Sequence, residues 1–255
     1  MRRTLYATTG VGDLTTMGKI EELDTIAAYD RIAPAFRELS QVRAAYLNAV
    51  DAEILQRIGE AKSLIDVGAG DGRRALQIAQ SAGITSVVLV EPSAGMRELI
   101  PADSEVWDTR IEALAASGRR FDVVLCLWNV LGHVPTELRL AALKNLANLC
   151  SESGGIFLDV INRYNLAECG CEVVLRRLFR DVTSSTDGDV PVRWRVGSEE
   201  VSTKGHVFTP REMKGLLRTS GLTATERVVL DYRTGRRGAW TWSGNLLYML
   251  RPAKS

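Results

Sequence analysis

The chain has 255 residues, in which 32 Lys and Arg balance 31 Asp and Glu and hydrophobic residues make up 45%. This length is enough for one large α/β domain with additions, and the balanced charge gives no bulk attraction to nucleic acid or to an anionic membrane. The four cysteines are too few for a disulfide framework. No apolar run approaches the roughly 20 residues of a membrane helix, and the first residues lack the apolar segment of a secretory signal. We therefore expect a cytoplasmic protein, monomer or homodimer, with no membrane or nucleic-acid partner.

Residues 1–60 are expected to form an N-terminal arm and a helical lid. Residues 1–17 carry few large apolar side chains, which is typical of a mobile arm. Apolar residues then recur at helical spacing from Ile20 to Leu39, interrupted by Pro34, and again from Ala44 to Ile58. The spacing predicts helices over both stretches.

The most informative stretch is an apolar run that ends in an acidic, glycine-rich turn, Ser63-Leu-Ile-Asp-Val-Gly-Ala-Gly-Asp-Gly72. Ser63–Val67 predicts a buried strand, and Arg73–Ala82 predicts a helix. Gly68 and Gly70 allow the backbone to approach a ligand closely, and the free N–H groups of the helix face the same crevice. Such a strand–turn–helix unit is typical of a nucleotide-binding α/β sheet.

The charges around this turn argue against a dinucleotide. A dinucleotide fingerprint needs a third glycine where this chain has Arg73. Asp66 and Asp71 place negative charge at the turn, which suits an ammonium or sulfonium group better than a pyrophosphate. Ser86–Ser93 predicts the next strand, and Glu91 near its end has the spacing of an acid that binds both ribose hydroxyls.

The turn resembles motif I of class I S-adenosylmethionine (SAM) methyltransferases, an acidic residue followed by G-x-G-x-G. Asn129–His133, Ala142–Ala147 and Asn162–Asn165 resemble stretches of the glycine N-methyltransferase-like small-molecule group. The resemblance implies an α/β fold with a Rossmann-like, seven-stranded, mostly parallel sheet and helices on both faces. It also implies an antiparallel C-terminal hairpin, an N-terminal helical lid and a strand-bearing insertion, within one domain of residues 1–255.

The same resemblance implies SAM as cofactor and a site at the carboxyl edge of the sheet within a core of residues 61–165. In that family a Tyr of the N-terminal segment covers the cofactor, here Tyr29, although packing of Tyr29 on the core explains its position equally well. Adenine lies against a polar–apolar pair, here Arg110 and Ile111; Arg110 cannot accept a hydrogen bond, so its contact must be stacking or through the backbone. The expected cofactor-binding residues are Tyr29, Asp66, Gly68, Ala69, Gly70, Glu91, Pro92, Met96, Arg110, Ile111 and Leu127.

Polar and aromatic side chains follow the fourth and fifth predicted strands, and parallel sheets place their reactive loops at this edge. Trp128 and Asn129 after the fourth strand, and Asn162 and Arg163 after the fifth, are the expected substrate-binding residues. The remaining elements of this core are strands over Ser104–Trp107, Phe121–Leu127 and Gly154–Ile161 and an amphipathic helix over Thr136–Cys150.

Two residues are candidates for catalysis. His133 is either a general base for a hydroxyl acceptor or part of a structural turn, and Tyr29 is the second candidate. Metal-assisted catechol chemistry needs carboxylates at the ends of the fourth and fifth strands. The loop after the fourth strand has none, Asp159 lies inside the fifth, and Cys169-x-Cys171 lacks zinc-ligand spacing, so we predict no metal.

Residues 166–209 break the alternation of strands and helices and are expected to form an insertion over the site. Val173–Phe179 and Val190–Val196 alternate apolar and charged residues, which predicts two half-exposed strands around a turn-rich loop at Thr183–Asp189. The arginines of these stretches form either a solvated strand face or a clamp for a carboxylate substrate. They are Arg176, Arg177, Arg193 and Arg195.

Residues 210–255 are expected to close the sheet. Thr209 is the predicted cap of a last helix, with Pro210 at its first position and Gly221 at its end. Thr225–Tyr232 and Leu246–Leu250 predict the two strands of the C-terminal hairpin.

Together these features predict an enzyme that transfers the methyl group of SAM to an N or O atom of a small molecule by in-line displacement. Two alternatives stay open, an RNA or protein methyltransferase and a non-catalytic SAM- or nucleotide-binding module. The nucleic-acid alternative lacks a D/N-P-P-Y/F tetrapeptide after the fourth strand, and the net charge is +1.

Overall fold

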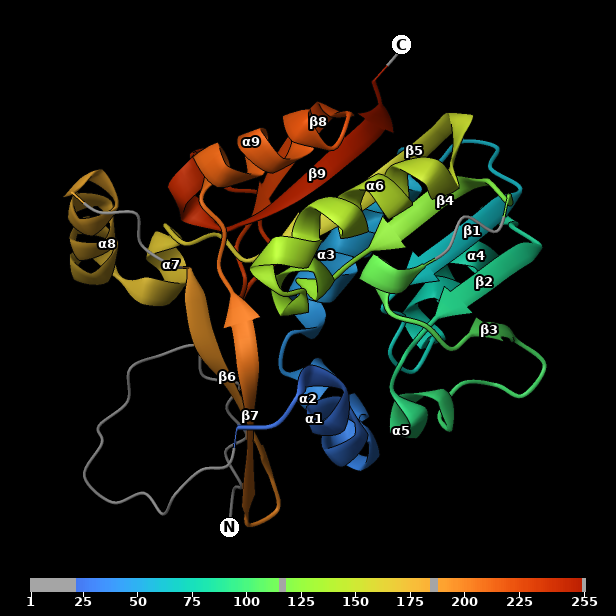
Figure 1. Ribbon diagram of the computed structural model, residues 1–255, viewed down its shortest axis with the longest axis horizontal. Helices are drawn as coiled ribbons and strands as arrows, with labels where there is room; N and C mark the ends of the chain where they lie inside the picture. The colour runs from blue at the N-terminus through green and yellow to red at the C-terminus, as the bar shows by residue number, and fades with distance from the viewer. Residues whose placement is uncertain (1–21, 115–117, 184–187, 254–255) are drawn as a thin grey trace.

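One mostly parallel sheet forms the frame of the structure (Figure 1). The computed structural model describes residues 22–114, 118–183 and 188–253, so the predicted arm at residues 1–17 lies outside the described residues. The strands of the sheet are β1 (Ser63–Val67), β2 (Ser86–Val90), β3 (Glu105–Trp107), β4 (Phe121–Cys126), β5 (Cys150–Val160), β8 (Leu222–Leu230) and β9 (Asn245–Pro252). They form a 7-stranded sheet in the order β3-β2-β1-β4-β5-β9-β8. β1 to β5 are parallel, and β9 is antiparallel to both β5 and β8, which confirms the predicted fold class.

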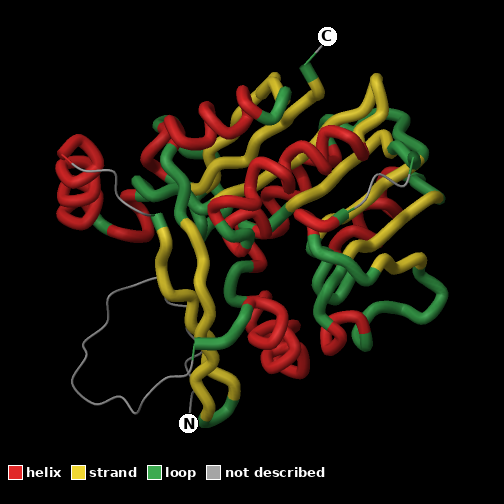
Figure 2. The backbone as a smooth tube through the Cα atoms, in the orientation of Figure 1, coloured by secondary structure: helices red, strands yellow, loops and turns green. Residues whose placement is uncertain are grey.

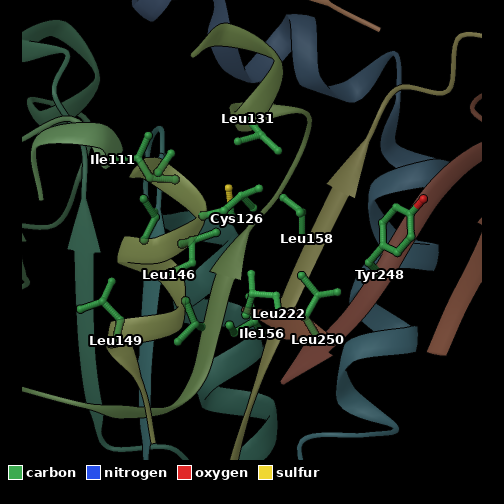
Figure 3. Close-up of a cluster of buried hydrophobic side chains, with 14 of the residues drawn as sticks. Ile111, Cys126, Leu131, Leu146, Leu149, Ile156, Leu158, Leu222, Tyr248 and Leu250 are labelled. Carbon is green, nitrogen blue, oxygen red and sulfur yellow. The ribbon is translucent and has the colours of Figure 1, made fainter. Parts of the chain in front are cut away.

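Helices cover both faces of this sheet. The main ones are α3 (Ala44–Leu55), α4 (Arg73–Ala82), α6 (Arg139–Leu149) and α9 (Pro210–Thr219). Val124 and Cys126 of β4 pack toward α6 and α9, whereas Val123 and Leu125 pack toward α3 and α4. Figure 3 shows the cluster between α6 and the sheet. Because alternate side chains of a strand point to opposite faces, a strand segment covered on both sides must be apolar throughout, as β4 is from Val123 to Cys126.

The strand order reverses between β1 and β4, since β2 and β3 continue to one side of β1 and β5 to the other. Ligands of open α/β sheets bind in the crevice outside the carboxyl ends of the strands at such a point. The turn after β1 and the loop after β4 therefore meet where a ligand is expected.

The N-terminal helices lie below the carboxyl edge of the sheet. They are α1 (Thr25–Ile32), a 3-10 turn η1 (Ala33–Ala35) and α2 (Phe36–Gln41). Pro34 lies in η1, so the predicted interruption of the helix is present. The amide of Leu23 donates to the carbonyl of Ser202, 2.9 Å away, and the Thr203 hydroxyl donates to the carbonyl of Leu23. These bonds tie the start of the lid to the insertion.

In the described residues the insertion consists of a short helix, a longer helix and a hairpin. These are α7 (Leu166–Cys169), α8 (Cys171–Thr183), β6 (Asp189–Val196) and β7 (Glu199–His206). The β6–β7 hairpin extends beyond the main sheet and runs beside α1 (Figures 1 and 2). A strand over Val190–Val196 is thus confirmed.

The predicted strand over Val173–Phe179 is wrong, because these residues belong to α8. Val174 is buried while Leu175 and Phe179 are exposed, so burial does not alternate along this segment. Glu172 and Arg176 form an ion pair at the i, i+4 spacing of a helix. The run of apolar and basic residues fits both a strand and a helix, and the local pattern did not distinguish the two periods.

No helix in the described part of the chain is long and apolar enough to cross a membrane.

α5 (Ala94–Arg97) follows β2 as a single short turn. It is capped by Ser93, whose hydroxyl accepts from the amide of Met96.

The last helix begins with a reciprocal capping box. The hydroxyl of Thr209 accepts from the amide of Glu212 at 3.0 Å, and the Glu212 carboxylate accepts from the amide of Thr209. Pro210 occupies the first turn, and Gly221, with φ +73°, follows the helix end as predicted.

We predict that Thr209→Ala lowers the free energy of unfolding by about 1 kcal/mol, because one helix N–H loses its acceptor. Thr209→Ser keeps the hydroxyl and is the matched control. Urea unfolding followed by circular dichroism measures both variants; equal losses for Ala and Ser would contradict the capping role.

Candidate active site

The glycine turn is shaped by contacts that only glycine permits. Gly68 has φ +80° and Gly70 has φ +59°, in the left-handed region that side chains disfavour. A Cβ on Gly68 would lie 2.5 Å from Cγ2 of Val130, and one on Gly70 would lie 3.2 Å from the Phe36 ring. Two distant segments, the loop after β4 and α2, therefore close against the turn.

The carboxylate of Glu91 joins the end of β2 to this turn. One oxygen accepts from the amide of Gly70 and the other from the amide of Ser93, each at 2.8 Å. Glu91 is 6% exposed, and burial raises the pKa of its carboxyl to about 7 against these two hydrogen bonds.

Asp66, the last but one residue of β1, is 5% exposed. Its Oδ1 has no hydrogen-bond partner. Burial raises the pKa of its carboxyl to about 7; the charge of Arg74 opposes the rise and that of Glu91 adds to it. A buried carboxylate oxygen without a hydrogen-bond donor costs free energy. We therefore expect a bound ligand to supply the donor to this atom.

A cavity of about 180 Å³ opens over the turn. Most of the residues predicted for the site line it: Tyr29, Asp66, Gly68, Ala69, Gly70, Glu91, Pro92, Arg110, Ile111, Leu127, Trp128 and His133. Four predicted residues do not line it: Met96, Asn129, Asn162 and Arg163.

Asn129 shapes the loop after β4 and does not face the cavity. Trp128 and Asn129 have φ values of 56° and 62°, which are uncommon for residues other than glycine. The Asn129 side chain is 4% exposed; its oxygen accepts from the amide of Ile161 and its nitrogen donates to the carbonyl of His206. These bonds stabilise the left-handed loop and leave Trp128, the preceding residue, on the cavity wall.

A buried carboxylate supports the same loop from the sheet. Asp159 of β5 accepts from the amide of Asn129 at 3.3 Å and from the hydroxyl of Tyr46 at 2.6 Å. Burial raises the pKa of Asp159, and the charge of Arg74 opposes the rise. The indole N–H of Trp128 donates to the hydroxyl of Tyr232, 3.1 Å away, which fixes the plane of its ring.

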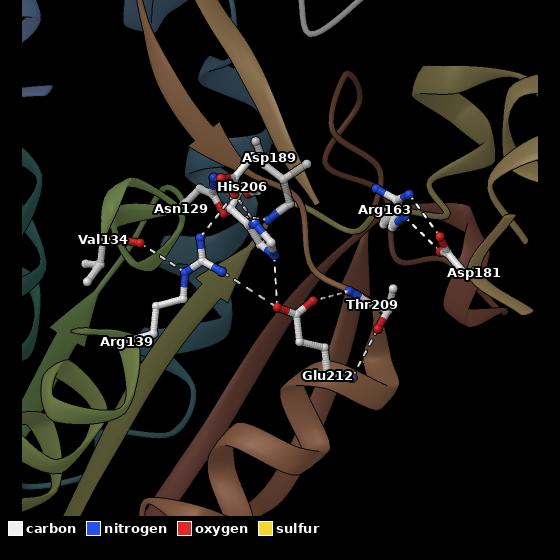
Figure 4. Close-up of polar contacts among 10 residues, drawn as sticks. Asn129, Val134, Arg139, Arg163, Asp181, Asp189, His206, Thr209 and Glu212 are labelled. Carbon is white, nitrogen blue, oxygen red and sulfur yellow. Dashed lines mark hydrogen bonds and ion pairs between the residues drawn. The ribbon is translucent and has the colours of Figure 1, made fainter. Parts of the chain in front are cut away.

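The side chains of Asn162, Arg163 and Met96 have other partners. The amide group of Asn162 donates to the carbonyls of Thr241 and Gly244. Arg163 forms a two-fold ion pair with Asp181 of α8, at 2.8 and 2.9 Å (Figure 4). Met96 is buried in a hydrophobic cluster with residues of α1. The expectation that Asn162 and Arg163 contact substrate is corrected by these bonds.

The predicted arginine clamp does not form at the cavity. Arg176 pairs with Glu172 and Arg177 donates to the carbonyl of Arg163, both on or beside α8. Arg193 lies 3.9 Å from Glu200 across the hairpin. None of the four predicted arginines lines the cavity.

His133 and Tyr29 meet across the cavity. The hydroxyl of Tyr29 lies 3.3 Å from Nε2 of His133, and Nδ1 of His133 lies 3.1 Å from the carbonyl of Lys204 in β7. Since a carbonyl only accepts, Nδ1 carries the proton and Nε2 accepts from Tyr29. Burial lowers the pKa of His133 to about 4 and raises that of Tyr29, so both are neutral at pH 7.

The base of the hairpin is tied to the body of the structure by a polar network (Figure 4). His206 contacts Asp189 through Nδ1 and Glu212 of α9 through Nε2, at 2.6 and 2.9 Å. Arg139 of α6 pairs with Asp189 and donates to the carbonyl of Val134, next to His133. The hairpin is thus held where its Lys204 carbonyl orients His133.

Several residues that line the cavity were not predicted from the sequence. Phe36 and Ser40 come from the lid helices, Val130 from the loop after β4, Glu112 from the loop after β3, and Arg74 from α4. The sequence does contain an indication for Arg74. A cation in the first turn of a helix is unfavourable next to the positive end of the helix dipole, so a nearby acidic side chain is expected. That acid is Asp51, whose Oδ1 lies 2.5 Å from Nε of Arg74.

Within the described ranges, no group of three or more His, Cys, Asp or Glu side chains is arranged to hold a metal ion.

A family model described as "Methyltransferase domain" matches residues 38–227. The chain belongs to this methyltransferase family. The match confirms the resemblance to SAM-dependent methyltransferases, the enzyme class and SAM as cofactor. No curated protein matches the sequence.

Solved methyltransferase structures share the fold at low sequence identity. The CcbJ methyltransferase from Streptomyces caelestis has a TM-score of 0.64 at 16% identity, over 89% of this chain and 98% of that one. The sugar N-methyltransferase KedS8 from Streptoalloteichus has 0.57 at 18%, over 96% and 99%. The 1,6-didemethyltoxoflavin-N1-methyltransferase from Burkholderia thailandensis has 0.58 at 16%, over 98% and 95%.

We predict that Gly68→Ala lowers the free energy of unfolding and weakens SAM binding. Alanine at this position has a strained backbone φ, and its Cβ also lies too close to Val130. Gly83→Ala is the matched control, since Gly83 has φ +69° and no atom within 4 Å of the position that a Cβ would take. The strain costs both variants about 1–2 kcal/mol, and overpacking adds about 1–3 kcal/mol only at Gly68. Urea unfolding and titration calorimetry measure the two effects; equal behaviour of both variants would contradict the close contact.

Proposed function

We propose that the chain transfers a methyl group from SAM to a nitrogen atom of a small-molecule amine. The observation that carries the choice of nitrogen is the state of His133, the one histidine among the residues that line the cavity. Its pKa is lowered to about 4 and its Nδ1 proton is committed to the Lys204 carbonyl. A weak, neutral base is sufficient for an acceptor that binds already uncharged and loses no proton before it attacks the methyl group, as an amine does.

The residues of the cavity fit the cofactor. Each oxygen of Glu91 accepts one backbone N–H, and a carboxylate has about four lone-pair sites, so capacity for two ribose hydroxyls remains. The unpartnered oxygen of Asp66 suits the ammonium group of the amino-acid end. Gly68 and Gly70 supply the close approach of the backbone.

The adenine end is expected beside Arg110 and Ile111, which line the cavity. Arg110 pairs with Asp24 of the lid at 3.2 Å and lies 4.0 Å from Glu112. Glu112 also lines the cavity, and its side chain is 12% exposed. We propose that Glu112 supplies the hydrogen-bond acceptor for the adenine amino group that Arg110 cannot supply.

When bound, SAM supplies a methyl group activated by a sulfonium. The chain's own task is to orient the acceptor and exclude water, which together contribute several kcal/mol to such reactions. Tyr29, Phe36 and Trp128 form an aromatic wall, with ring centroids of Phe36 and Trp128 5.8 Å apart. Trp194 of the hairpin packs against Tyr29 at 5.6 Å and holds it over the cavity. Tyr29 and His133 then orient the acceptor nitrogen by hydrogen bonds.

Two structural neighbours support nitrogen as the acceptor: KedS8 is a sugar N-methyltransferase, and the Burkholderia enzyme is named for N1 methylation of a small heterocycle. The near-zero net charge supports a small-molecule substrate over a nucleic acid. We also propose a single cytoplasmic domain acting as a monomer or homodimer, supported by the lid and the core lining one cavity and by the contacts of the insertion with Tyr29 and His133.

We predict that, among amines, phenols and carboxylates offered with SAM, only amines give release of S-adenosylhomocysteine (SAH). Turnover of phenols alone would contradict nitrogen methylation. SAM binding without turnover of any panel member would favour a non-catalytic binding module, and absence of SAM binding by folded protein would contradict the whole proposal.

We predict that His133→Asn lowers kcat/KM for an amine by about tenfold or less and leaves the pH profile between pH 6 and 9 unchanged. The pKa of the imidazole is lowered to about 4, below this range. Removing the imidazole therefore does not change how the rate depends on pH between 6 and 9. A general base would contribute about 10²- to 10⁴-fold. Steady-state kinetics across pH decide the point; a loss above 100-fold with a vanished limb would make His133 a catalytic base.

A further inference from the structure

Tyr232 contacts the aromatic wall of the cavity without lining the cavity itself. It follows β8 and is 8% exposed, and its hydroxyl accepts from the indole N–H of Trp128 at 3.1 Å. Trp128 lines the cavity and Tyr232 does not. An influence of the Tyr232 hydroxyl on a ligand in this cavity must therefore pass through Trp128.

The hydrogen bond to Tyr232 gives the indole of Trp128 a defined direction. The ring also packs at Phe36 of α2 and on the hydrophobic cluster between the sheet and helices α3 and α4. Apolar packing tolerates rotation of a ring, whereas a bond from a single N–H group weakens steeply as its angle departs from the preferred one. The orientation of Trp128 therefore depends on the position of the Tyr232 hydroxyl.

The ring of Tyr232 is itself held by two contacts. The guanidinium of Arg43 lies over its face, with 4.0 Å between Cζ and the ring centroid. The ring of Tyr46 meets it edge-on, with centroids 4.9 Å apart. A cation over an aromatic face is attracted to it, and more strongly where water is excluded, as it is at Arg43, which is 8% exposed. Tyr232 thus has little freedom to move.

Arg43 connects this contact to the lid and to the insertion. It lies between α2 and α3, and its Nη2 donates to Glu168 of α7 at 3.0 Å. Its Nε is buried without a hydrogen-bond partner, so stacking on Tyr232 is the compensation that this part of the guanidinium receives. Arg43 does not line the cavity, and methyl transfer needs no cation at its position. Its contacts point to a role in holding Tyr232.

We propose that Tyr232 is a positioning residue, which sets through Trp128 the angle at which the aromatic wall presents the acceptor to the cofactor, and that Arg43 holds Tyr232 in place. This inference rests on the proposed function, since it assumes that the acceptor lies against Trp128. No covalent step is involved. Loss of the bond lowers the fraction of bound acceptor that is aligned for in-line attack, so the effect falls on kcat and not on cofactor binding.

The first measurement is nuclear magnetic resonance of the full chain labelled with nitrogen-15 in its tryptophans. The chain has five tryptophans, and the indole signal that Trp128→Phe removes belongs to Trp128. We expect Tyr232→Phe to shift this signal upfield and to speed exchange of its hydrogen with solvent by about two- to tenfold, because the N–H loses its acceptor. Tyr248→Phe is the matched control: Tyr248 is 4% exposed and packs on the opposite face of the sheet, so its loss leaves the Trp128 signal unmoved.

The second measurement is steady-state kinetics with an amine. Tyr232→Phe is expected to lower kcat by about three- to tenfold, with KM and the affinity for SAH within about twofold of wild type. Tyr248→Phe leaves all three within about twofold. In the background of Trp128→Phe, which keeps an aromatic ring without the N–H, Tyr232→Phe has no further effect, because the contact through which it acts is already absent.

An unmoved Trp128 signal in Tyr232→Phe, or kinetic losses that simply add in the double variant, would overturn the inference while leaving the proposed function intact. A loss confined to SAH affinity would overturn it as well. If Tyr232→Phe does not fold, Arg43→Lys decides, since lysine keeps the charge for Glu168 but not the planar stack on Tyr232; an unmoved Trp128 signal in that variant would overturn the inference. Failure of the wild-type chain to bind SAM or to methylate any amine would instead overturn the proposed function.

Discussion

Buried carboxyl groups at the carboxyl ends of parallel strands are the constraint on which the site depends. Asp66, Glu91 and Asp159 belong to or follow β1, β2 and β5, and each is at most 6% exposed. Such burial is stable only where donors or cations compensate it. The compensation comes from backbone amides, from Tyr46 and from Arg74, so the same bonds that satisfy the carboxylates also fix the glycine turn and the loop after β4.

The positions of Tyr29 and His133 at the cavity depend on contacts with the insertion rather than with the sheet. The carbonyl of Lys204 sets the tautomer of His133, and Trp194 packs on Tyr29. The hairpin that carries both is held at its base by His206, between Asp189 and Glu212. Changes in the hairpin can therefore alter the acceptor side of the site without altering the residues that face the glycine turn.

What could be predicted from the sequence was local. β1 and α4 have the predicted bounds, because an apolar run, glycines and a helical repeat are all contained in one stretch. The prediction of a strand over Val173–Phe179 is wrong because the local order of apolar and basic residues fits both the repeat of a strand and the repeat of a helix. Asn129 and Asn162 were misplaced because their partners, the carbonyls of His206 and Thr241, lie about eighty residues away along the chain. Arg163 has the same explanation, since no pattern in its own segment indicates Asp181.

The hydrogen bonds of the glycine turn explain why this site suits a sulfonium nucleoside and not a dinucleotide. In a phosphate-binding turn the backbone N–H groups point at the ligand. Here they are already used within the protein: the amides of residues 68 and 69 donate to Val90, that of residue 70 to Glu91, that of residue 72 to Ala69 and that of residue 73 to Asp71. A pyrophosphate would meet two carboxylates and few free donors, whereas a cation meets the unpartnered oxygen of Asp66. The selectivity therefore lies in how the turn satisfies its own amides, and the glycines provide only the shape.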